Sequence, residues 1–198
     1  MAVEVTVEQV KELRNQTGAG VLDCRTALAE CGCDMEAAMR LLREKGLAEA
    51  AKRAGRETHE GRIESYVHPG NRIGVLVEVN CETDFVARTD DFVHLVHELA
   101  LQVAATNPRY LAKEDVPEEI LEEERSLYRS QVEGEKPPHV IERIVEGKLG
   151  KFYEENCLLE QPSIRTPDCK VKDMILNFIA QVGENVVVRR FVRYELGA

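Results

Sequence analysis

The spacing of apolar residues changes near residue 62, and this change limits the fold more than any other feature of the chain. Before this point, apolar side chains recur at the spacing of helices. After it they alternate as in a half-buried strand, and the turn residues 68–71 (His-Pro-Gly-Asn) interrupt the alternation. After the turn, the alternation continues on one face with Ile73, Val75, Val77 and Val79. The segment therefore predicts a β-hairpin preceded by helices.

Residues 1–47 predict a compact module of three short helices. Thr6 begins a sequence of the capping-box form, and Gly18 is suited to end the first helix. After a second apolar run, Asp34 is a favourable N-cap for a third helix. We expect this third helix to end at Gly46, because glycine interrupts helices readily.

The remainder of the chain predicts a connector and an α+β domain. Residues 48–60 are helix-prone and charged, with few large apolar side chains, which indicates a connector. Residues 61–198 form the second predicted domain, in which a terminal strand gives the hairpin its third partner and helices pack on one face of a small antiparallel sheet. The helices of this domain are expected at 90–106, 117–132, 138–155 and 171–182, and the strand at 186–196.

Charge and composition argue against several functions. The net charge of −10 opposes binding to a phosphate backbone, and the acid excess is concentrated in residues 110–160, with 14 acidic and 7 basic side chains. No apolar stretch approaches the roughly 20 residues that a membrane span needs. The N-terminus has neither a basic start nor a signal-like apolar block. We therefore expect a cytoplasmic protein that binds neither nucleic acid directly nor a membrane.

Signals for catalysis are weak. Gly18 and Gly20 lack the preceding strand and third glycine of a dinucleotide loop, and the sequence has neither a phosphate-binding loop nor a nucleophile elbow. The six cysteines lack zinc-site spacing and are expected to be reduced and mostly buried. His94 and His97 could pair on a metal or be solvated beside Glu98. The acidic run 122–124 reads as a solvated helix face. We expect no metal and no cofactor.

Residues 80–89 (NCETDFVART) place a phenylalanine among polar and charged neighbours, immediately before a helix start. In one interpretation Phe85 packs under the hairpin as the first core residue of the next helix. In the other, the ring is exposed in order to contact a partner. The spacing of residues alone does not decide between them.

Two stretches, LRNQTGAGVLDCRTAL (13–28) and EVNCETDFVAR (78–88), resemble the signature regions of the elongation factor Ts family, the guanine-nucleotide exchange factors of elongation factor Tu. The stretches NPRYL, GKLGKF and ENVVVRRFVRYELG extend the similarity along essentially the whole chain. The short length resembles the compact form, which has one core subdomain and no long inserted coiled-coil hairpin. Such a chain is expected to form a homodimer, for which the terminal strand offers a surface.

The resemblance also implies a set of site residues. The TDFVAR element, with Thr83, Asp84, Phe85 and Val86, would disturb the magnesium site of the GTPase. Phe85 would wedge between helices there, and Asp84 would engage neighbouring groups. His68, at the hairpin tip, matches a position suspected of touching the GTPase.

The N-terminal module is similar to a ubiquitin-associated domain, which in the family docks on the GTPase. This similarity implicates Leu13, Arg14, Val21 and Leu22. The family often has two methionines where this chain has Val21 and Leu22, and these two side chains could instead pack within the module.

The expected function is thus nucleotide exchange during translation, without covalent chemistry. Two alternatives remain open at this point. The chain could be an adaptor in which a ubiquitin-associated-like module is tethered to an unrelated α+β domain, or it could be a cysteine or histidine enzyme.

Overall fold

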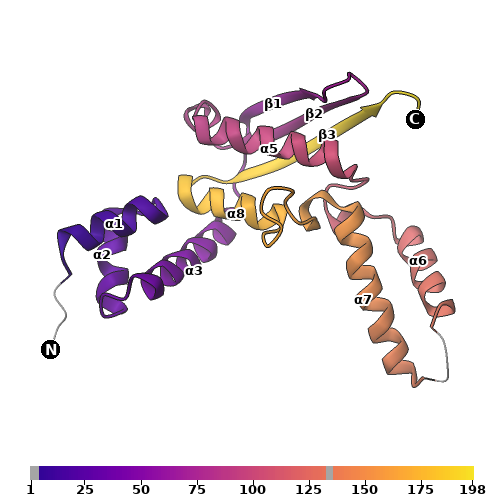
Figure 1. Cartoon of the computed structure of the whole chain (residues 1–198), viewed down its shortest axis with the longest axis horizontal. Helices are drawn as coiled ribbons and strands as arrows, with labels where there is room; N and C mark the ends of the chain where they lie inside the picture. Colours follow the sequence, from indigo (N-terminus) through magenta and orange to yellow (C-terminus); the bar gives the residue numbers. More distant parts are fainter. Residues whose placement is uncertain (1–4, 133–135) are drawn as a thin grey trace. The chain divides into compact units, whose positions relative to one another are not determined.

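The structure is a computed structural model that describes residues 5–132 and 136–198 (Figure 1). Residues 1–4 of the predicted N-terminal module lie outside this described part. Short 3-10 turns, η1 (Lys113–Asp115) and η2 (Leu158–Glu160), accompany the main elements. In chain order the main elements are α1 (Val7–Thr17), α2 (Val21–Glu30), α3 (Met35–Arg53), β1 (Glu60–Val67), β2 (Ile73–Cys81), α4 (Asp84–Ala87), α5 (Asp90–Thr106), α6 (Glu118–Ser130), α7 (Pro138–Asn156), α8 (Val171–Val182) and β3 (Val186–Glu195).

The chain divides into two compact units, each built from separate stretches of sequence. Unit 1 contains Met1–Gly61, Asn80–Arg88 and Ile175–Val187. Unit 2 contains Arg62–Val79, Thr89–Met174 and Val188–Ala198. The segment that carries Phe85 therefore belongs to the same unit as the N-terminal helices.

The first helices of unit 1 follow the predicted pattern. The Gln9 amide donates to Thr6 Oγ1 at 3.2 Å and the Thr6 amide donates to Gln9 Oε1 at 3.0 Å, which confirms the capping box. Gly18 ends α1 with a φ of 70°, a conformation that favours glycine. The core of this three-helix module consists of Val10, Leu13, Cys24, Ala27, Leu28 and Ala38.

The third helix is longer than the sequence suggested. The prediction that it ends at Gly46 was wrong, because α3 continues to Arg53. A Cβ atom at Gly46 would lie 3.1 Å from the Cβ of Ala180 in α8, closer than most such contacts. The glycine therefore permits close packing of two helices in unit 1 and does not end the helix.

The three-stranded antiparallel sheet is as predicted, and its strand order is β1-β2-β3. The amide of Leu196, just after β3, donates to the carbonyl of Arg72, just before β2, at 2.8 Å. Further along, Arg190 Nε lies 2.7 Å from Glu78 Oε2. The late part of β3 thus pairs with the early part of β2, which fixes the register.

Helix α5 covers one face of the part of the sheet that lies in unit 2 (Figure 1). Its His97 contacts Glu64 of β1 at 3.3 Å, and Arg193 of β3 donates to the carbonyl of Ala104 at 3.3 Å. Alternate β2 residues and an apolar stripe along α5 are all buried, namely Val75, Val77, Val79, Phe92, Leu95, Val96, Leu99 and Val103. The predicted α+β fold with a helix-covered sheet is confirmed.

Helices α6 and α7 begin and end close to their predicted positions and pack against each other. Their shared core includes Leu121, Val145 and Phe152, and Arg129 Nε pairs with Glu142 at 3.0 Å. The two helices form a packed pair within unit 2. Among the helices of the described residues, none is long and apolar enough to cross a membrane.

Gln102 of α5 connects the helix to the loop that follows η2. The side chain is 2% exposed. Its Nε2 donates to Gln161 Oε1 at 3.1 Å and to the carbonyl of Pro162 at 3.2 Å, and its Oε1 accepts from the amide of Ile164 at 2.9 Å.

Replacing this side chain should destabilise the fold. Gln102→Met keeps the length but leaves the Ile164 amide and the Pro162 carbonyl without this partner, which costs about 1–3 kcal/mol. Urea unfolding followed by circular dichroism measures the change. The control Gln16→Met, at an exposed position, should shift stability by less than about 0.5 kcal/mol. Equal stability of the two variants would contradict the prediction.

Candidate functional site

The element predicted to contact a partner is a single helical turn, α4. Thr83 is its N-cap, and the Thr83 hydroxyl accepts from the amide of Val86 at 3.5 Å. Val86 is buried, whereas the Phe85 side chain is 81% exposed. Of the two interpretations of this ring, the structure favours the exposed one. An aromatic ring held in solvent on a turn anchored by its neighbour is available for contact with another molecule.

Asp84 lies beside this ring at the start of the turn. Its Oδ2 pairs with Arg88 Nη2 at 2.9 Å, and both side chains are partly exposed. Exposed pairs of this kind contribute little to stability because solvent screens them. Asp84 can therefore exchange Arg88 for another partner at little cost.

Cys81 closes the end of β2 directly before the turn. The thiol is fully buried, and it donates to the carbonyl of Thr83 at 3.1 Å. Burial, with the nearby negative charges of Glu184 and Glu60, raises the pKa of Cys81 to about 11. The thiol is therefore protonated at neutral pH and remains a hydrogen-bond donor to the backbone of the turn.

The four implicated residues of the N-terminal module divide into two groups. Val21 is 56% exposed and Leu22 is 75% exposed, so neither is packed within the module, and Arg14 is also exposed. Leu13 is fully buried in the module core. A direct contact with a partner is thus open to Arg14, Val21 and Leu22, whereas Leu13 holds α1 in place.

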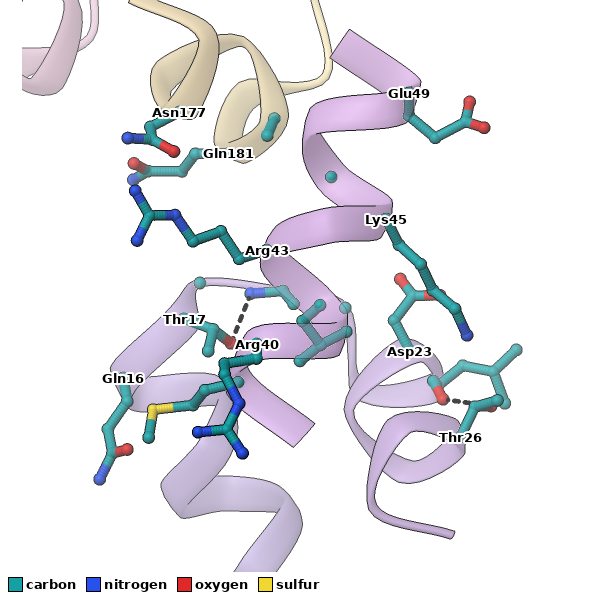
Figure 2. Close-up of a pocket in the computed structure, with 18 of the residues that line it drawn as sticks. Gln16, Thr17, Asp23, Thr26, Arg40, Arg43, Lys45, Glu49, Asn177 and Gln181 are labelled. Atoms are coloured by element: carbon teal, nitrogen blue, oxygen red, sulfur yellow. Dashed lines mark hydrogen bonds between the residues drawn. The ribbon is translucent and has the colours of Figure 1, made fainter. Parts of the chain in front are cut away.

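A pocket of about 870 Å³ lies in unit 1, next to Leu22. Its walls come from the α1–α2 turn, from α3 and from the second half of α8, where Arg43 and Gln181 reach toward each other (Figure 2). The charged side chains that line it are Asp23, Arg40, Arg43, Lys45, Glu49 and Arg53. This mixture of charges suits polar contacts with a ligand or protein surface.

The histidines that the sequence singled out lie in unit 2. His68 is exposed at the hairpin tip, where its Nδ1 lies 2.9 Å from the hydroxyl of Tyr66. His97 contacts Glu64, and His94 Nε2 lies 4.0 Å from Glu98 Oε1. Within residues 5–132 and 136–198, no group of three or more potential ligands could hold a metal ion.

The cysteines are distributed over both units, and all six are free thiols. Three of them are buried and three are partly exposed.

Glu184 supports α4 but gave no signal in the sequence. Glu184 accepts from the amide of Thr83 at 3.0 Å and from its hydroxyl at 2.7 Å. The partners are separated by 101 positions in the sequence, and no local pattern links them. Only the pairing of β3 with β2 brings the two segments together.

Comparisons with known proteins find relatives along nearly the whole chain. A family model described as "Elongation factor TS" matches residues 34–198. Elongation factor Ts of Caldanaerobacter subterraneus subsp. tengcongensis is 58% identical over 98% of this chain and 97% of that relative. Its counterpart in Thermotoga neapolitana is 57% identical over 98% of both chains. Elongation factor Ts of Herpetosiphon aurantiacus is 54% identical over 99% of this chain and all of that relative.

These matches define the chain as a translation elongation factor. Within that class it belongs to the elongation factor Ts family.

The buried thiol of Cys81 generates a prediction about pH. Its pKa is about 11 in the folded chain and 9.0 ordinarily, so folding favours the protonated form. This contribution to stability is complete below pH 9 and is lost as the pH rises toward 11. The difference in unfolding free energy between the wild type and Cys81→Ala should therefore shrink over this range, by on the order of 2 kcal/mol. Urea unfolding at several pH values measures it, and a constant difference would contradict the prediction.

Proposed function

We propose that the chain is a guanine-nucleotide exchange factor that binds elongation factor Tu with GDP and promotes release of the GDP. It acts by disturbing the magnesium site of the GTPase, after which GTP can bind. The observation that carries the proposal is the 81% exposure of Phe85 on a short, anchored turn. Membership of the elongation factor Ts family supports the choice of elongation factor Tu as the partner.

The chemistry of the turn suits a wedge. A phenylalanine ring buries a large apolar area with few rotatable bonds, so little conformational freedom is lost when it enters a pocket. Phe85 inserts between helices of the GTPase close to the magnesium ion and displaces side chains that hold the ion. Asp84 leaves its weak pair with Arg88 and engages groups beside the inserted ring.

The wedge alone has a limited effect on nucleotide affinity. Burying one phenylalanine contributes roughly 1.5–3 kcal/mol. Each 1.4 kcal/mol changes an equilibrium constant about tenfold, so the wedge can weaken GDP binding by about ten- to a few-hundred-fold. Further contacts must add to this effect.

The N-terminal module supplies some of these contacts. The exposed side chains of Arg14, Val21 and Leu22 dock on the GTPase domain. Leu13 contributes indirectly, by holding α1 in the module core. His68, exposed at the hairpin tip, adds a contact from unit 2.

The mechanism follows from linkage. If the factor lowers the affinity of the GTPase for GDP, GDP lowers its affinity for the factor by the same ratio. A ternary complex is therefore short-lived, and either ligand can leave. A cellular excess of GTP sets the direction of exchange. The factor itself needs no cofactor and performs no covalent chemistry, and it works in the cytoplasm with the translation machinery.

We further propose that two copies of the chain form a homodimer through the sheet face that α5 leaves uncovered. Strand alternation places exposed apolar residues of all three strands on this face, and the β2–β3 register sets Val192 opposite Leu76. Monomeric proteins rarely expose large contiguous apolar patches. The exposed apolar side chains of these strands and of the residue after β3 are Ile63, Val67, Leu76, Val192, Tyr194 and Leu196.

The central experiment measures release of fluorescent GDP from elongation factor Tu. The wild-type protein should accelerate release, and Phe85→Ala should reduce the acceleration by about ten- to a few-hundred-fold, because the ring contributes its burial energy to exchange. Circular dichroism should show an unchanged fold, since the ring is not in the core of the chain.

A matched control is Ile164→Ala, which truncates another exposed apolar side chain and should leave release unchanged. Full activity of the Phe85→Ala variant would refute the wedge. An inactive wild-type protein would refute nucleotide exchange and favour an adaptor.

The dimer is tested by light scattering over a range of concentrations. Val192→Glu places a charge in the proposed apolar interface, where an unpaired charge costs several kcal/mol, so this variant should have the mass of a monomer. The control Arg189→Glu changes a charge on the opposite side of β3 and should retain the mass of a dimer. A monomeric wild type at all concentrations would contradict the proposal.

A further inference from the structure

The first question about the exposed ring of Phe85 is what holds it in a fixed orientation. Helix α4 has only four residues, and so short a helix has no stability of its own in water. The ring makes no core contacts that could fix the turn, because it is 81% exposed. A wedge on a mobile turn would lose much of its binding energy to ordering. The direction of the ring must therefore be set by neighbouring residues.

Glu184 provides the strongest contacts to this turn. Its Oε2 accepts from the backbone amide of Thr83 at 3.0 Å, and its Oε1 accepts from the Thr83 hydroxyl at 2.7 Å. Both donors of one residue thus bind both oxygens of one carboxylate. Hydrogen bonds to an ionised acceptor are shorter and stronger than neutral ones.

The same contacts orient the helix cap. A threonine hydroxyl has one proton to donate. When that proton goes to Glu184, the oxygen lone pairs are left to face the amide of Val86, which lies 3.5 Å away at the first turn. The carboxylate therefore fixes the rotamer of Thr83, and through it the start of α4.

A second carboxylate makes the reverse contact. The amide of Asn185 donates to Glu82 Oε1 at 2.6 Å. Each of the two segments, 82–83 and 184–185, thus gives a backbone amide to a carboxylate of the other. The Asn185 side chain is buried and donates to the carbonyl of Arg56 at 2.8 Å, which connects this pairing to the chain beyond α3.

The backbone before Glu184 explains how the carboxylate reaches the turn. Gly183 ends α8 with a φ of 78°, in the left-handed region that glycine adopts readily. The chain then reverses direction and enters β3 at Val186.

We propose that Glu184 is a positioning residue of nucleotide exchange: by holding both donors of Thr83, it sets the direction in which Phe85 points toward the GTPase. This inference rests on the proposed function. Glu184 itself need not touch the GTPase, because it acts through Thr83 and the helical turn.

The test is a double-mutant cycle in the GDP-release assay. Glu184→Gln keeps the size of the side chain but removes the charge and replaces one acceptor with a donor. The maximal rate of release should fall about tenfold, the effect of losing a charged hydrogen bond. The concentration of factor at half-maximal rate should change less than twofold, since the module surface is intact. In the Phe85→Ala background, Glu184→Gln should have no further effect.

A merely structural role would give a different pattern. If Glu184 only stabilised the fold, its substitution would lower the rate by the same factor with or without the ring of Phe85. Additive effects would therefore overturn the positioning role, as would full activity of the single Glu184→Gln variant. The control Glu142→Gln removes another paired carboxylate, on α7, and should leave the maximal rate unchanged.

Amide hydrogen exchange gives a readout that does not need the GTPase. In Glu184→Gln, the amides of residues 83–87 should exchange at least tenfold faster than in the wild type, whereas those of 75–79 in β2 should not change. Unchanged protection of 83–87 would overturn the proposal even if the GTPase assay failed. An inactive wild type with loosened 83–87 amides in the variant would overturn the proposed function and, with it, the role of Glu184 in exchange.

Discussion

The reciprocal pairing of two carboxylates with two backbone amides is the interaction on which the candidate site depends. Glu184 binds the amide of Thr83, and Glu82 binds the amide of Asn185. These contacts join the end of the hairpin to the start of β3. The short helix α4, which carries the exposed ring of Phe85, begins at the same point. The hydrophobic effect would otherwise favour folding that ring onto the protein. Polar contacts on the inner side of the turn allow the apolar side chain to remain outside.

The N-terminal module likewise combines residues that hold a helix in place with residues that are exposed to solvent. Leu13, Cys24 and Leu28 belong to a small core, and the first turn of α2 leaves Val21 and Leu22 in solvent. In both places a buried residue lies within two positions of an exposed one, as Val86 does beside Phe85 and Cys24 does beside Leu22. A short stretch can thus contain both residues that stabilise the fold and residues that are exposed for contact with a partner. Amino-acid composition alone does not tell the two kinds apart.

The sequence was sufficient to predict those elements that are determined by residues close together in the chain. The capping box at Thr6 and the turn at 68–71 appear where their residue patterns predicted them, and α5 spans the predicted residues 90–106. The end of α3 was missed because Gly46 serves a contact with Ala180, which lies far away in sequence.

The candidate site also depends on contacts between distant residues, which local sequence patterns do not reveal. Phe85 stands out in the sequence as an apolar residue among polar ones, but its exposure followed from the structure and not from its spacing. Glu184 gave no signal, because a carboxylate at the end of a helix has many possible partners until the strands are paired. The contact between Glu184 and Thr83 depends on the pairing of distant segments, so it could not be predicted from local sequence patterns.

The distance in sequence between Thr83 and Glu184 has a consequence for synthesis of the chain. On the ribosome, the helical turn with its phenylalanine emerges long before the carboxylate that orients it, since 101 positions separate the two partners. The nascent chain therefore carries the ring without this support until the segment that contains Glu184 has been synthesised. Under the function proposed above, a nascent chain that lacks Glu184 presents the ring without a fixed direction, so it competes poorly with the finished factor for the GTPase.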